Sequence, residues 1–495
     1  MTAMKMVYRF SDLKVILGRG LQLLKRLSQM AGGDGIDLYL VGGAVRDMIL
    51  REIKGCDVQI NDFDISLPIR PMKFAHDFAA ETGGAFVLLD EEFPTVRVIV
   101  DGDLIVDFSQ FRAPTLEGDL SLRDLTVNAI AVKLEDLLSA GQVELIDPMG
   151  GYQDMLDGII RFCSERSVWD DPLRMLRAYR FAAALNFEIS PESRRIVRRK
   201  AQLISESASE RVRDELLKLL DSSNSHRWVK GMDEDGLLSV IIPEINPTKG
   251  VEQNEYHHLD VWGHTLLAYQ IFEENPIPKP LEEFGDKVKE YLECEFTGGV
   301  NRYVLIKLAL LLHDIGKPET RSVDEEGRIH FYGHDRLGAE MARRICMRLR
   351  LSRRGSSLIE LLIKNHLGLM HLGKDYPPTD RALYRFLRKV GEEWLGEVLL
   401  SMADLEASQG PGRSDEETEM TGEIVRKLAH LYYVEIPRRK AHRRIVTGDD
   451  LIRELNLSPG PIIGKLLREI EEAHAIGRVK TKEEALELAR RLIRG

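Results

Sequence analysis

The chain has 495 residues, of which 43% are hydrophobic and 30% are charged, with a formal net charge of −11. This length predicts several domains with sizeable cores, and the composition excludes a largely disordered protein. The N-terminus lacks an apolar signal segment, and no apolar run reaches membrane-spanning length, so we expect a cytoplasmic protein without a membrane partner. The cysteines are far apart, which argues against a disulfide framework and a cysteine zinc site. They are Cys56, Cys163, Cys294 and Cys346.

Basic residues are clustered although the net charge is negative. Clusters lie at residues 174–180, 194–200, 343–354 and 438–444. A nucleic-acid site needs a basic patch and not a basic protein, so an RNA partner stays compatible with the composition. A solvated helix face is the alternative for any one cluster.

The expected elements change character along the chain. Residues 11–30 form an amphipathic pattern that predicts one helix. The following 120 residues alternate β-like runs with helical stretches, and helical periodicity dominates from Asp154 onward. Turn-rich stretches at 246–250 and 409–415 mark two boundaries. We therefore expect an α+β chain with an N-terminal helical extension (1–35), an α/β head (36–153), a helical neck and body (154–250), a second helical domain (251–410) and a helical tail (411–495).

The segment from Leu38 to Ser66 carries the strongest chemical signal. An apolar run enters the turn Gly42-Gly43, a helix-like segment follows, and a second extended run presents Asp62 and Asp64. The glycines allow close approach of phosphate oxygens, and a helix N-terminus offers free N–H groups to an anion. Carboxylates at i and i+2 of a strand point the same way, and Mg²⁺ would relieve their repulsion. Each half alone is more often an ordinary turn or strand end, but together they indicate nucleotidyl transfer.

A third carboxylate follows in the strand-like run 104–108. Metal-assisted phosphoryl transfer needs carboxylates for the ions and an activated hydroxyl for attack. Asp107 is the natural third member of this set, and an ordinary strand-end residue is its alternative.

These motifs, GGAVRD followed by DFD, resemble the nucleotidyltransferase superfamily in the variant of the tRNA CCA-adding enzymes and bacterial poly(A) polymerases. Two later blocks agree: LRDLTVNAI at 122–130 resembles RRDFTxNAI, with Leu122 in place of the first Arg, and DDPLR at 170–174 resembles EDxxR. The resemblance implies CTP and ATP as substrates and an RNA 3′ end, such as that of tRNA, as acceptor. It implies catalysis by Asp62, Asp64 and Asp107 with Mg²⁺, and nucleotide binding by Gly42, Gly43, Arg46, Arg123, Asp124, Asn128, Asp171, Arg174, Arg177 and Arg180.

Asp171 and Arg174 are the expected base-reading pair. Residues at i and i+3 of a helix are neighbours, so the two side chains can project together. Asp accepts from an exocyclic amino group and Arg donates to a ring nitrogen or carbonyl, so the pair can read C or A without a nucleic-acid template. A helical salt-bridge ladder is the alternative.

The chain departs from the family between Arg112 and Leu122. CCA-adding relatives carry a longer flexible loop here, which lets one pocket switch from C to A. The short segment resembles enzymes that add only the two C residues. Addition of CC, of CCA or of A alone stays open at this point, as does repeated A addition by a poly(A) polymerase.

A second constellation consists of spaced histidines and aspartates. Adjacent buried His and Asp are costly without a metal, and imidazole with carboxylate suits Mn, Fe, Ni or Mg ions. The order resembles the HD phosphohydrolase superfamily and implies a metal-bound water that attacks a phosphoester, as in trimming a damaged tRNA 3′ end. The alternatives are an HD scaffold that has lost catalysis, or an HD phosphohydrolase with a degenerate RNA-binding head. The expected ligands are His264, His313, Asp314 and Asp404, with His334 and His366 as the additional histidines of two-metal members.

Overall fold

The computed structural model describes residues 6–55, 59–90, 94–140, 142–412, 414–440 and 445–494. Cys56 lies outside these ranges. The chain divides into two compact units, which are Met1–Ser222 with Gly231–Ile241, and Ser223–Lys230 with Ile242–Gly495. The finer boundaries expected at 35, 153, 250 and 410 stay predictions.

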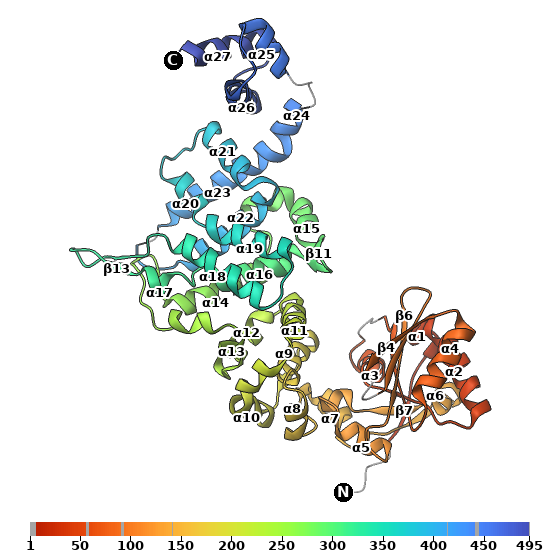
Figure 1. Cartoon of the computed structure of the whole chain (residues 1–495). Coiled ribbons are helices and arrows are strands. Elements are labelled where there is room, and N and C mark those ends of the chain that lie inside the picture. The colour runs from red at the N-terminus through yellow and green to blue at the C-terminus, as the bar shows by residue number, and fades with distance from the viewer. Residues whose placement is uncertain are drawn as a thin grey trace. The chain divides into compact units, whose positions relative to one another are not determined.

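The first unit is built around a six-stranded sheet (Figure 1). Its strand order is β4-β5-β6-β3-β2-β7, with β3 and β6 parallel and all other neighbours antiparallel. The alternation of buried and partly exposed residues along β5 and β6 is typical of strands covered on one face. The strands are β2 (Tyr39–Val41), β3 (Asp62–Leu67), β4 (Ala85–Asp90), β5 (Thr95–Val100), β6 (Leu104–Gln110) and β7 (Ala131–Lys133).

The predicted single helix over 11–30 is wrong, because two helices occupy this segment. They are α1 (Leu13–Leu17) and α2 (Gly20–Asp34). Gly18 adopts φ +51° and its N–H donates to the carbonyl of Lys14, which ends α1. A glycine tolerates this left-handed conformation at little cost, so the amphipathic pattern continues through a break in the helix.

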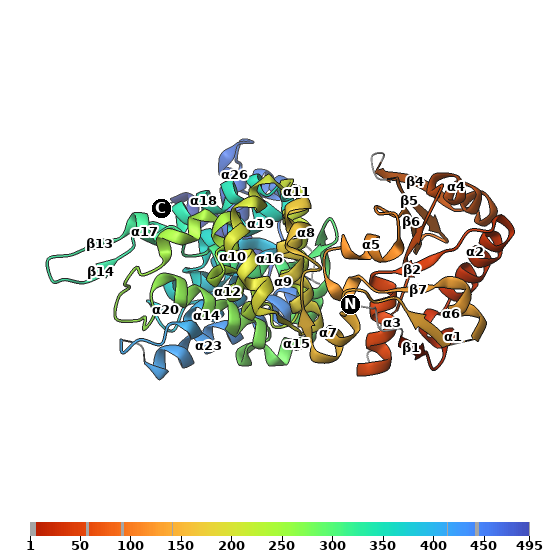
Figure 2. The same cartoon turned by 90° about the horizontal axis from the view of Figure 1, so that it is seen from below.

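Helices flank the sheet (Figure 2). The helix α3 (Gly43–Lys54) begins directly after β2, and α4 (Pro71–Thr82) packs against β5. Gly20 at the start of α2 packs so closely on the ring of Phe63 that a Cβ would lie 2.2 Å from it. These contacts bury the apolar face of β3 and leave its carboxylates on the other face.

The rest of the first unit is mostly helical and holds a buried ion network. It also contains two small sheets, β1 (Met6–Arg9) with β8 (Gln142–Leu145) and β9 (Ile159–Ile160) with β10 (Glu188–Ile189). The helices α9 (Arg174–Leu185) and α11 (Ser209–Asp221) pack together, and α10 (Pro191–Lys200) carries a basic cluster. The buried carboxylate of Asp235 accepts from Nε of Arg194 at 2.6 Å and from Nε of Arg198 at 2.7 Å. Part of the basic cluster is therefore committed to structure and not to a partner.

The second unit is almost entirely helical. Among its helices α14 packs on α16 and α22, and α19 packs on α16 and α18. The last helices share a small core of their own around Leu451, Leu466 and Ala485. No helix within the described ranges is long and apolar enough to cross a membrane. The bounds are α14 (Val261–Glu274), α16 (Arg302–Leu312), α18 (His334–Arg348), α19 (Arg353–Asn365), α22 (Trp394–Ala407), α25 (Gly448–Leu455), α26 (Pro461–Ala475) and α27 (Lys482–Arg494).

Candidate functional site

The strand register brings three carboxylates onto one face of the sheet. Asp64 lies opposite Asp107 across the parallel pair β3 and β6, and Asp62 is two residues before Asp64 on the same face. On the other neighbour of β6, the strand β5, Arg97 lies opposite Asp107. Its guanidinium makes a bidentate contact with this carboxylate, in which Nε donates to Oδ1 at 2.9 Å and Nη2 donates to Oδ2 at 2.8 Å. The three predicted acidic residues thus form one row with an arginine at its end.

Negative charge is crowded in this row. Burial, together with the carboxylates of Asp64 and Asp107, raises the pKa of Asp62 to about 6. Burial also raises the pKa of Asp64, with Arg123 opposing the shift. Burial disfavours the ionised carboxylates, and their mutual repulsion adds to this cost, which a divalent cation would relieve. The donor set of oxygens fits Mg²⁺ held by Asp62 and Asp64.

The glycine turn is fitted directly against this row. Gly42 adopts φ +69°, and a Cβ there would lie 2.8 Å from Oδ2 of Asp64 and 3.3 Å from Nη1 of Arg123. A side chain at position 42 would therefore displace a predicted metal ligand. Gly43 is the first residue of α3, so the free N–H groups of that helix begin beside the carboxylates.

A chain of buried polar contacts fixes the side chains behind the turn. Nη1 of Arg46 donates to Oδ1 of Asn128 at 2.6 Å, and Nδ2 of Asn128 donates to Asp124 at 3.2 Å. Asp124 also accepts from Nε and Nη2 of Arg177 at 2.9 and 2.7 Å. Burial opposes ionisation of Asp124, but Arg177 outweighs it, so the pKa of Asp124 is lowered. The network brings four predicted site residues together and keeps them ionised or hydrogen-bonded.

The expected pair Asp171 and Arg174 has separate partners. Oδ2 of Asp171 accepts from Nη2 of Arg211 at 2.8 Å. Nη1 of Arg174 donates to the backbone carbonyls of Leu122 and Arg123 at 2.8 and 3.1 Å. Reading a base with this pair would require at least one of these contacts to be shared or exchanged.

The remaining predicted arginines lie against acids or an aromatic ring. Nε of Arg180 donates to Oε2 of Glu215 at 2.6 Å, and its guanidinium lies 3.8 Å from the ring centroid of Phe181. Arg123 donates from Nη2 to Oγ of Ser66 at 3.1 Å, and its buried Nε has no hydrogen-bond partner among the described residues. Arg123 therefore retains donor capacity next to the glycine turn.

The short segment before Arg123 is a helix and not an open loop. Thr115 caps α5 (Leu116–Ser121) by accepting from the N–H of Gly118 at 3.1 Å. The buried carboxylate of Asp119 accepts from the N–H of Arg112 at 3.0 Å and lies 3.6 Å from Nη2 of Arg123. The segment expected to be short is thus helical and tied to the site through Asp119.

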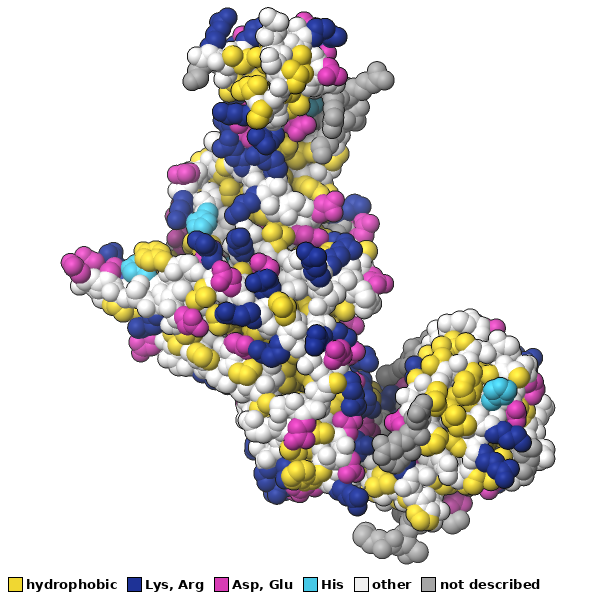
Figure 3. Space-filling model, viewed as in Figure 1, with side chains coloured by type: hydrophobic (Ala, Val, Ile, Leu, Met, Phe, Trp, Pro, Cys, Tyr) yellow, Lys and Arg dark blue, Asp and Glu magenta, His cyan; other side chains and the backbone are white. Residues whose placement is uncertain are grey.

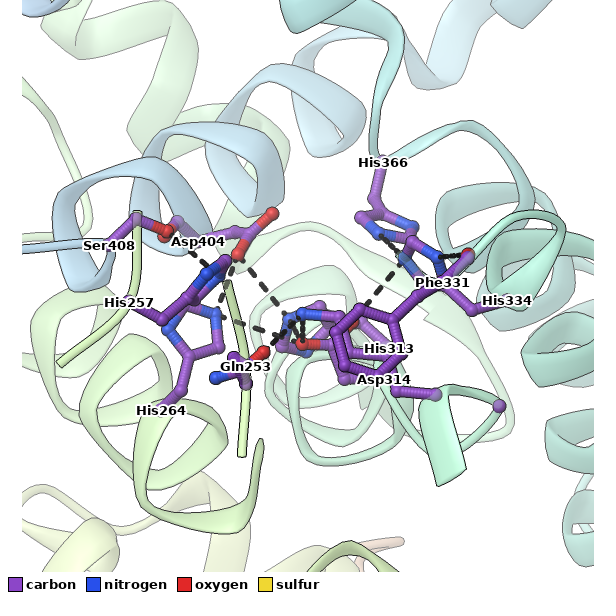
Figure 4. A network of polar contacts seen from close by, with 12 residues as sticks. Gln253, His257, His264, His313, Asp314, Phe331, His334, His366, Asp404 and Ser408 are labelled. Atoms are coloured by element: carbon purple, nitrogen blue, oxygen red, sulfur yellow. Dashed lines mark hydrogen bonds and ion pairs between the residues drawn. The ribbon is translucent and has the colours of Figure 1, made fainter. Parts of the chain in front are cut away.

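The second unit brings all six predicted histidines and aspartates together. Figure 4 shows the His313–Asp314 pair with His264 and Asp404 on one side and His334 and His366 on the other. Two sets of potential ligands result, each with its ligand atoms within 4.8 Å of one another. The sets are His264, His313 and Asp404, and Asp314, His334 and His366.

Three of these histidines have the tautomer that leaves Nε2 free to bind a cation. Nδ1 donates to a backbone carbonyl at 2.8 Å in His313, 2.7 Å in His334 and 2.6 Å in His366. Each ring therefore turns Nε2 inward, and Nε2 of His334 lies only 3.1 Å from Nε2 of His366. Burial lowers the pKa of His366 to about 4, so that ring is neutral. Two inward lone pairs at this distance suit a shared divalent metal, with the carbonyls as the outer support.

Three residues that motif reasoning did not assign complete the two sites. Arg97 could have been noticed as a lone charge in the apolar run TVRVIV, and Arg211 as part of ERVRDE. Lys317 follows the HD pair in HDIGK, and its Nζ lies 2.6 Å from Oδ2 of Asp314. The partners of Arg97 and Arg211 depend on strand register or helix packing, which the sequence does not display, whereas Lys317 reaches Asp314 over a local i,i+3 spacing.

Family models match four successive parts of the chain. Residues 38–161 match the model "Poly A polymerase head domain", and residues 186–249 match the model described as "Probable RNA and SrmB-binding site of polymerase A". Residues 261–402 match the HD domain, and residues 419–489 match tRNA nucleotidyltransferase domain 2. The fold and the sites thus define a nucleotidyltransferase with an HD domain, which is an enzyme class that generally uses divalent metals.

Curated relatives specify the family. The A-adding tRNA nucleotidyltransferase of Deinococcus radiodurans is 35% identical over 90% of this chain and 93% of its own length. The CC-adding tRNA nucleotidyltransferase of Thermus thermophilus is 30% identical over 91% and 92%. A multifunctional CCA protein of Neisseria meningitidis is 32% identical over 68% and 74%. The chain belongs to the tRNA nucleotidyltransferase family.

Solved structures agree on the fold. A CCA-adding enzyme in complex with CTP covers 99% of this chain and 100% of its own, at TM-score 0.67 and 22% identity. The Thermotoga maritima CCA-adding enzyme complexed with tRNA has the same coverage at TM-score 0.66. The predicted fold class, a nucleotidyltransferase head followed by helical parts, is confirmed.

Proposed function

We propose that this enzyme transfers a nucleotide from CTP or ATP to the 3′-hydroxyl of tRNA and releases pyrophosphate. The observation that carries the proposal is the row of Asp62, Asp64 and Asp107 fitted against the Gly42 turn. The relatives named as tRNA nucleotidyltransferases favour tRNA over the generic RNA that a poly(A) polymerase would extend.

Different residues of the head have different roles in the in-line transfer of the nucleotide. Asp62 and Asp64 would hold Mg²⁺, which supplies charge neutralisation for the triphosphate. The α3 N-terminus and Arg123 bind phosphate oxygens, and Asp107, oriented by Arg97, accepts the proton of the attacking hydroxyl.

Base choice rests on Asp171 and Arg174. A carboxylate oxygen of Asp171 accepts from the exocyclic amino group that both C and A carry, while Arg174 donates to a ring atom. Nη2 of Arg211 already donates a hydrogen bond to Oδ2 of Asp171, so the bound base and Arg211 share this carboxylate.

The enzyme adds only part of the CCA sequence, either CC or the terminal A. The segment between Arg112 and Arg123 is short and pinned through Asp119, which disfavours the pocket remodelling needed to accept first C and then A. The relatives from Deinococcus and Thermus, aligned over nine tenths of the chain, are named for partial addition.

Three tRNA transcripts test this proposal, ending before CCA, after the first C and after the second C. Each is incubated with CTP, ATP or both, and products are resolved at single-nucleotide length. We expect either CC addition from CTP or one A from ATP on the CC end, but not both. Complete CCA on the shortest transcript would overturn partial addition, and long A tails on generic RNA would overturn the tRNA assignment.

The HD site supports a second reaction, the hydrolysis of a phosphoester at an RNA 3′ end. The six ligands would hold one or two divalent ions, such as Mn, Ni, Fe or Mg, which would supply a hydroxide for attack. The ammonium of Lys317 lies at the edge of this cluster and can bind the phosphate that is attacked. Hydrolysis of a nucleoside 2′,3′-cyclic phosphate that depends on added Mn²⁺ would test it, and no turnover with any of the four metals would contradict it.

A further inference from the structure

A short hairpin stands beside the HD ligands. It is formed by β13 (Ser322–Val323) and β14 (Ile329–His330), and it projects from the helical unit in Figures 1 and 3. Tyr332 follows its second strand with 77% of the residue exposed. Its exposed ring offers a large apolar face to a ligand.

The Tyr332 ring is held in place on one face. It stacks on the ring of His330, with centroids 5.0 Å apart and an interplanar angle of 12°. Nε2 of His330 is in turn 2.8 Å from Oδ2 of Asp324 across the hairpin. The two rings thus form a flat, supported platform whose outer side is open to solvent.

The platform is close to the metal ligands. Tyr332 precedes His334 by two residues, so their Cα atoms are at most about 7 Å apart. Phe331, the residue directly before Tyr332, is buried, and its carbonyl accepts from Nδ1 of His334 at 2.7 Å. The ring centroid of Phe331 lies 5.5 Å from Nζ of Lys317, which contacts Asp314, and Figure 4 draws Phe331 with the HD ligands. The backbone of this segment therefore connects the platform to the metal ligands.

We infer that Tyr332, supported by His330, stacks on the nucleobase next to the phosphoester that the HD site hydrolyses. This inference rests on the proposed phosphohydrolase activity and names its ligand class, an RNA 3′-terminal nucleotide with its base. Stacking accepts any base, because every base presents a π face, and it suits a site that acts on RNA ends of varied sequence. The oxygen of a water forms a new bond to phosphorus of the terminal 2′,3′-cyclic phosphate, one ribose O–P bond breaks, and the released ribose oxygen takes up a proton. The product is a 2′- or 3′-phosphomonoester on the terminal nucleotide, and the stacked base keeps that phosphate at the ligands.

The test compares two cyclic phosphates on the full-length, Mn²⁺-loaded protein. One is adenosine 2′,3′-cyclic phosphate, and the other is glycerol 1,2-cyclic phosphate, which has no base. Tyr332→Ala should raise KM for the adenosine substrate about tenfold, with kcat nearly unchanged and the glycerol substrate unaffected. Tyr332→Phe should behave as wild type. Val323→Ala, which trims a side chain that is 52% exposed on the same hairpin, is the matched control and should also behave as wild type.

A binding measurement distinguishes two outcomes, namely that Tyr332 does not stack on a base and that the HD site does not hydrolyse phosphoesters. Affinity for adenosine 2′-monophosphate is measured with Mn²⁺ and with saturating CTP and Mg²⁺ to occupy the head. If the wild type turns over neither substrate, the proposed hydrolysis fails, but tenfold weaker binding by Tyr332→Ala would still support the platform. Equal binding by wild type and Tyr332→Ala, or equal loss on both substrates, would overturn it and would assign the exposed ring to a protein partner or to the hairpin's own fold. Thermal unfolding of each variant, compared with wild type, verifies that the unit with the HD site is folded, and nucleotide addition to tRNA verifies the head.

Discussion

Single residues in the head are governed by crowded charge. Asp62 carries a pKa of about 6 because burial disfavours its charged form and the carboxylates of Asp64 and Asp107 add repulsion, while Arg97 supplies only part of the compensation. The structure therefore stores electrostatic repulsion that a bound cation would release.

Protons should compete with Mg²⁺ at this site. Above about pH 6 Asp62 is ionised and available to the metal, and below it the proton occupies the carboxyl. We expect the Mg²⁺ concentration for half-maximal addition to rise as the pH falls from 7.5 to 5. Asp62→Asn should abolish addition and raise the metal-free folding stability by about 1 kcal/mol at pH 7.5, with no gain at pH 4. Thermal unfolding at both pH values, with wild type as control, measures this; a variant less stable at pH 7.5 would contradict it.

Arg97 should act through Asp107. Arg97→Gln removes the two-pronged contact, so Asp107 is free to rotate away from the attacking hydroxyl. We expect kcat for nucleotide addition to fall by about 10- to 100-fold while KM for CTP or ATP changes little. Arg97→Lys keeps the charge without the fork and should give an intermediate kcat. A variant with unchanged kcat and raised KM would assign Arg97 to nucleotide binding instead.

Among the elements, the junction of β2, Gly42 and α3 sets the position of the phosphate site. Gly42→Ala introduces a Cβ at φ +69° and 2.8 Å from Oδ2 of Asp64. We expect a loss of about 1–2 kcal/mol of stability and a fall in addition of at least about 100-fold. Gly18→Ala is the matched control, since its φ is +51° but nothing lies within 4 Å of the new Cβ. Similar activity in both variants would show that backbone strain, and not the contact with Asp64, matters.

At the scale of strands and helices, some features of the site follow from the sequence pattern and others depend on how the elements pair and pack. The row of Asp62, Asp64 and Asp107 was predictable, because period-two patterning fixes which strand side chains share a face. The partner of Asp107 was not, since Arg97 pairs with it only through the register of β5 on β6. Likewise, the predicted pairing of Asp171 with Arg174 did not include Arg211. This residue comes 40 positions after Asp171 and contacts it only because the helices pack together. The break at Gly18 was missed because hydrophobic periodicity continues across it.

At the scale of the whole molecule, the two sites belong to different compact units. Asp62 lies in the first unit, and Asp314 lies in the second among its own buried ligands. Independent cores suggest that each chemistry can be removed alone.

We therefore expect that each of the two activities can be abolished by a substitution that leaves the other activity intact. Asp314→Asn should abolish HD phosphohydrolysis and leave nucleotide addition within twofold, and Asp62→Asn should do the reverse. Both activities are assayed on the same preparations. His366→Gln is a second HD variant, because Asp314→Asn leaves Lys317 without its carboxylate and could unfold that region locally. Loss of addition in both HD variants would show that the sites are coupled.

The order of charges across β5, β6 and β3 has a consequence for folding. Arg97, Asp107 and Asp64 stand side by side, while their sequence neighbours Val98, Val106 and Phe63 fill the apolar core behind them. A strand that paired one residue out of alignment would turn these ionised groups into that core, at a cost far above the stability gained by pairing. The residues that perform the chemistry thus also reject misaligned sheets, so the head cannot close stably before its catalytic row is correctly assembled.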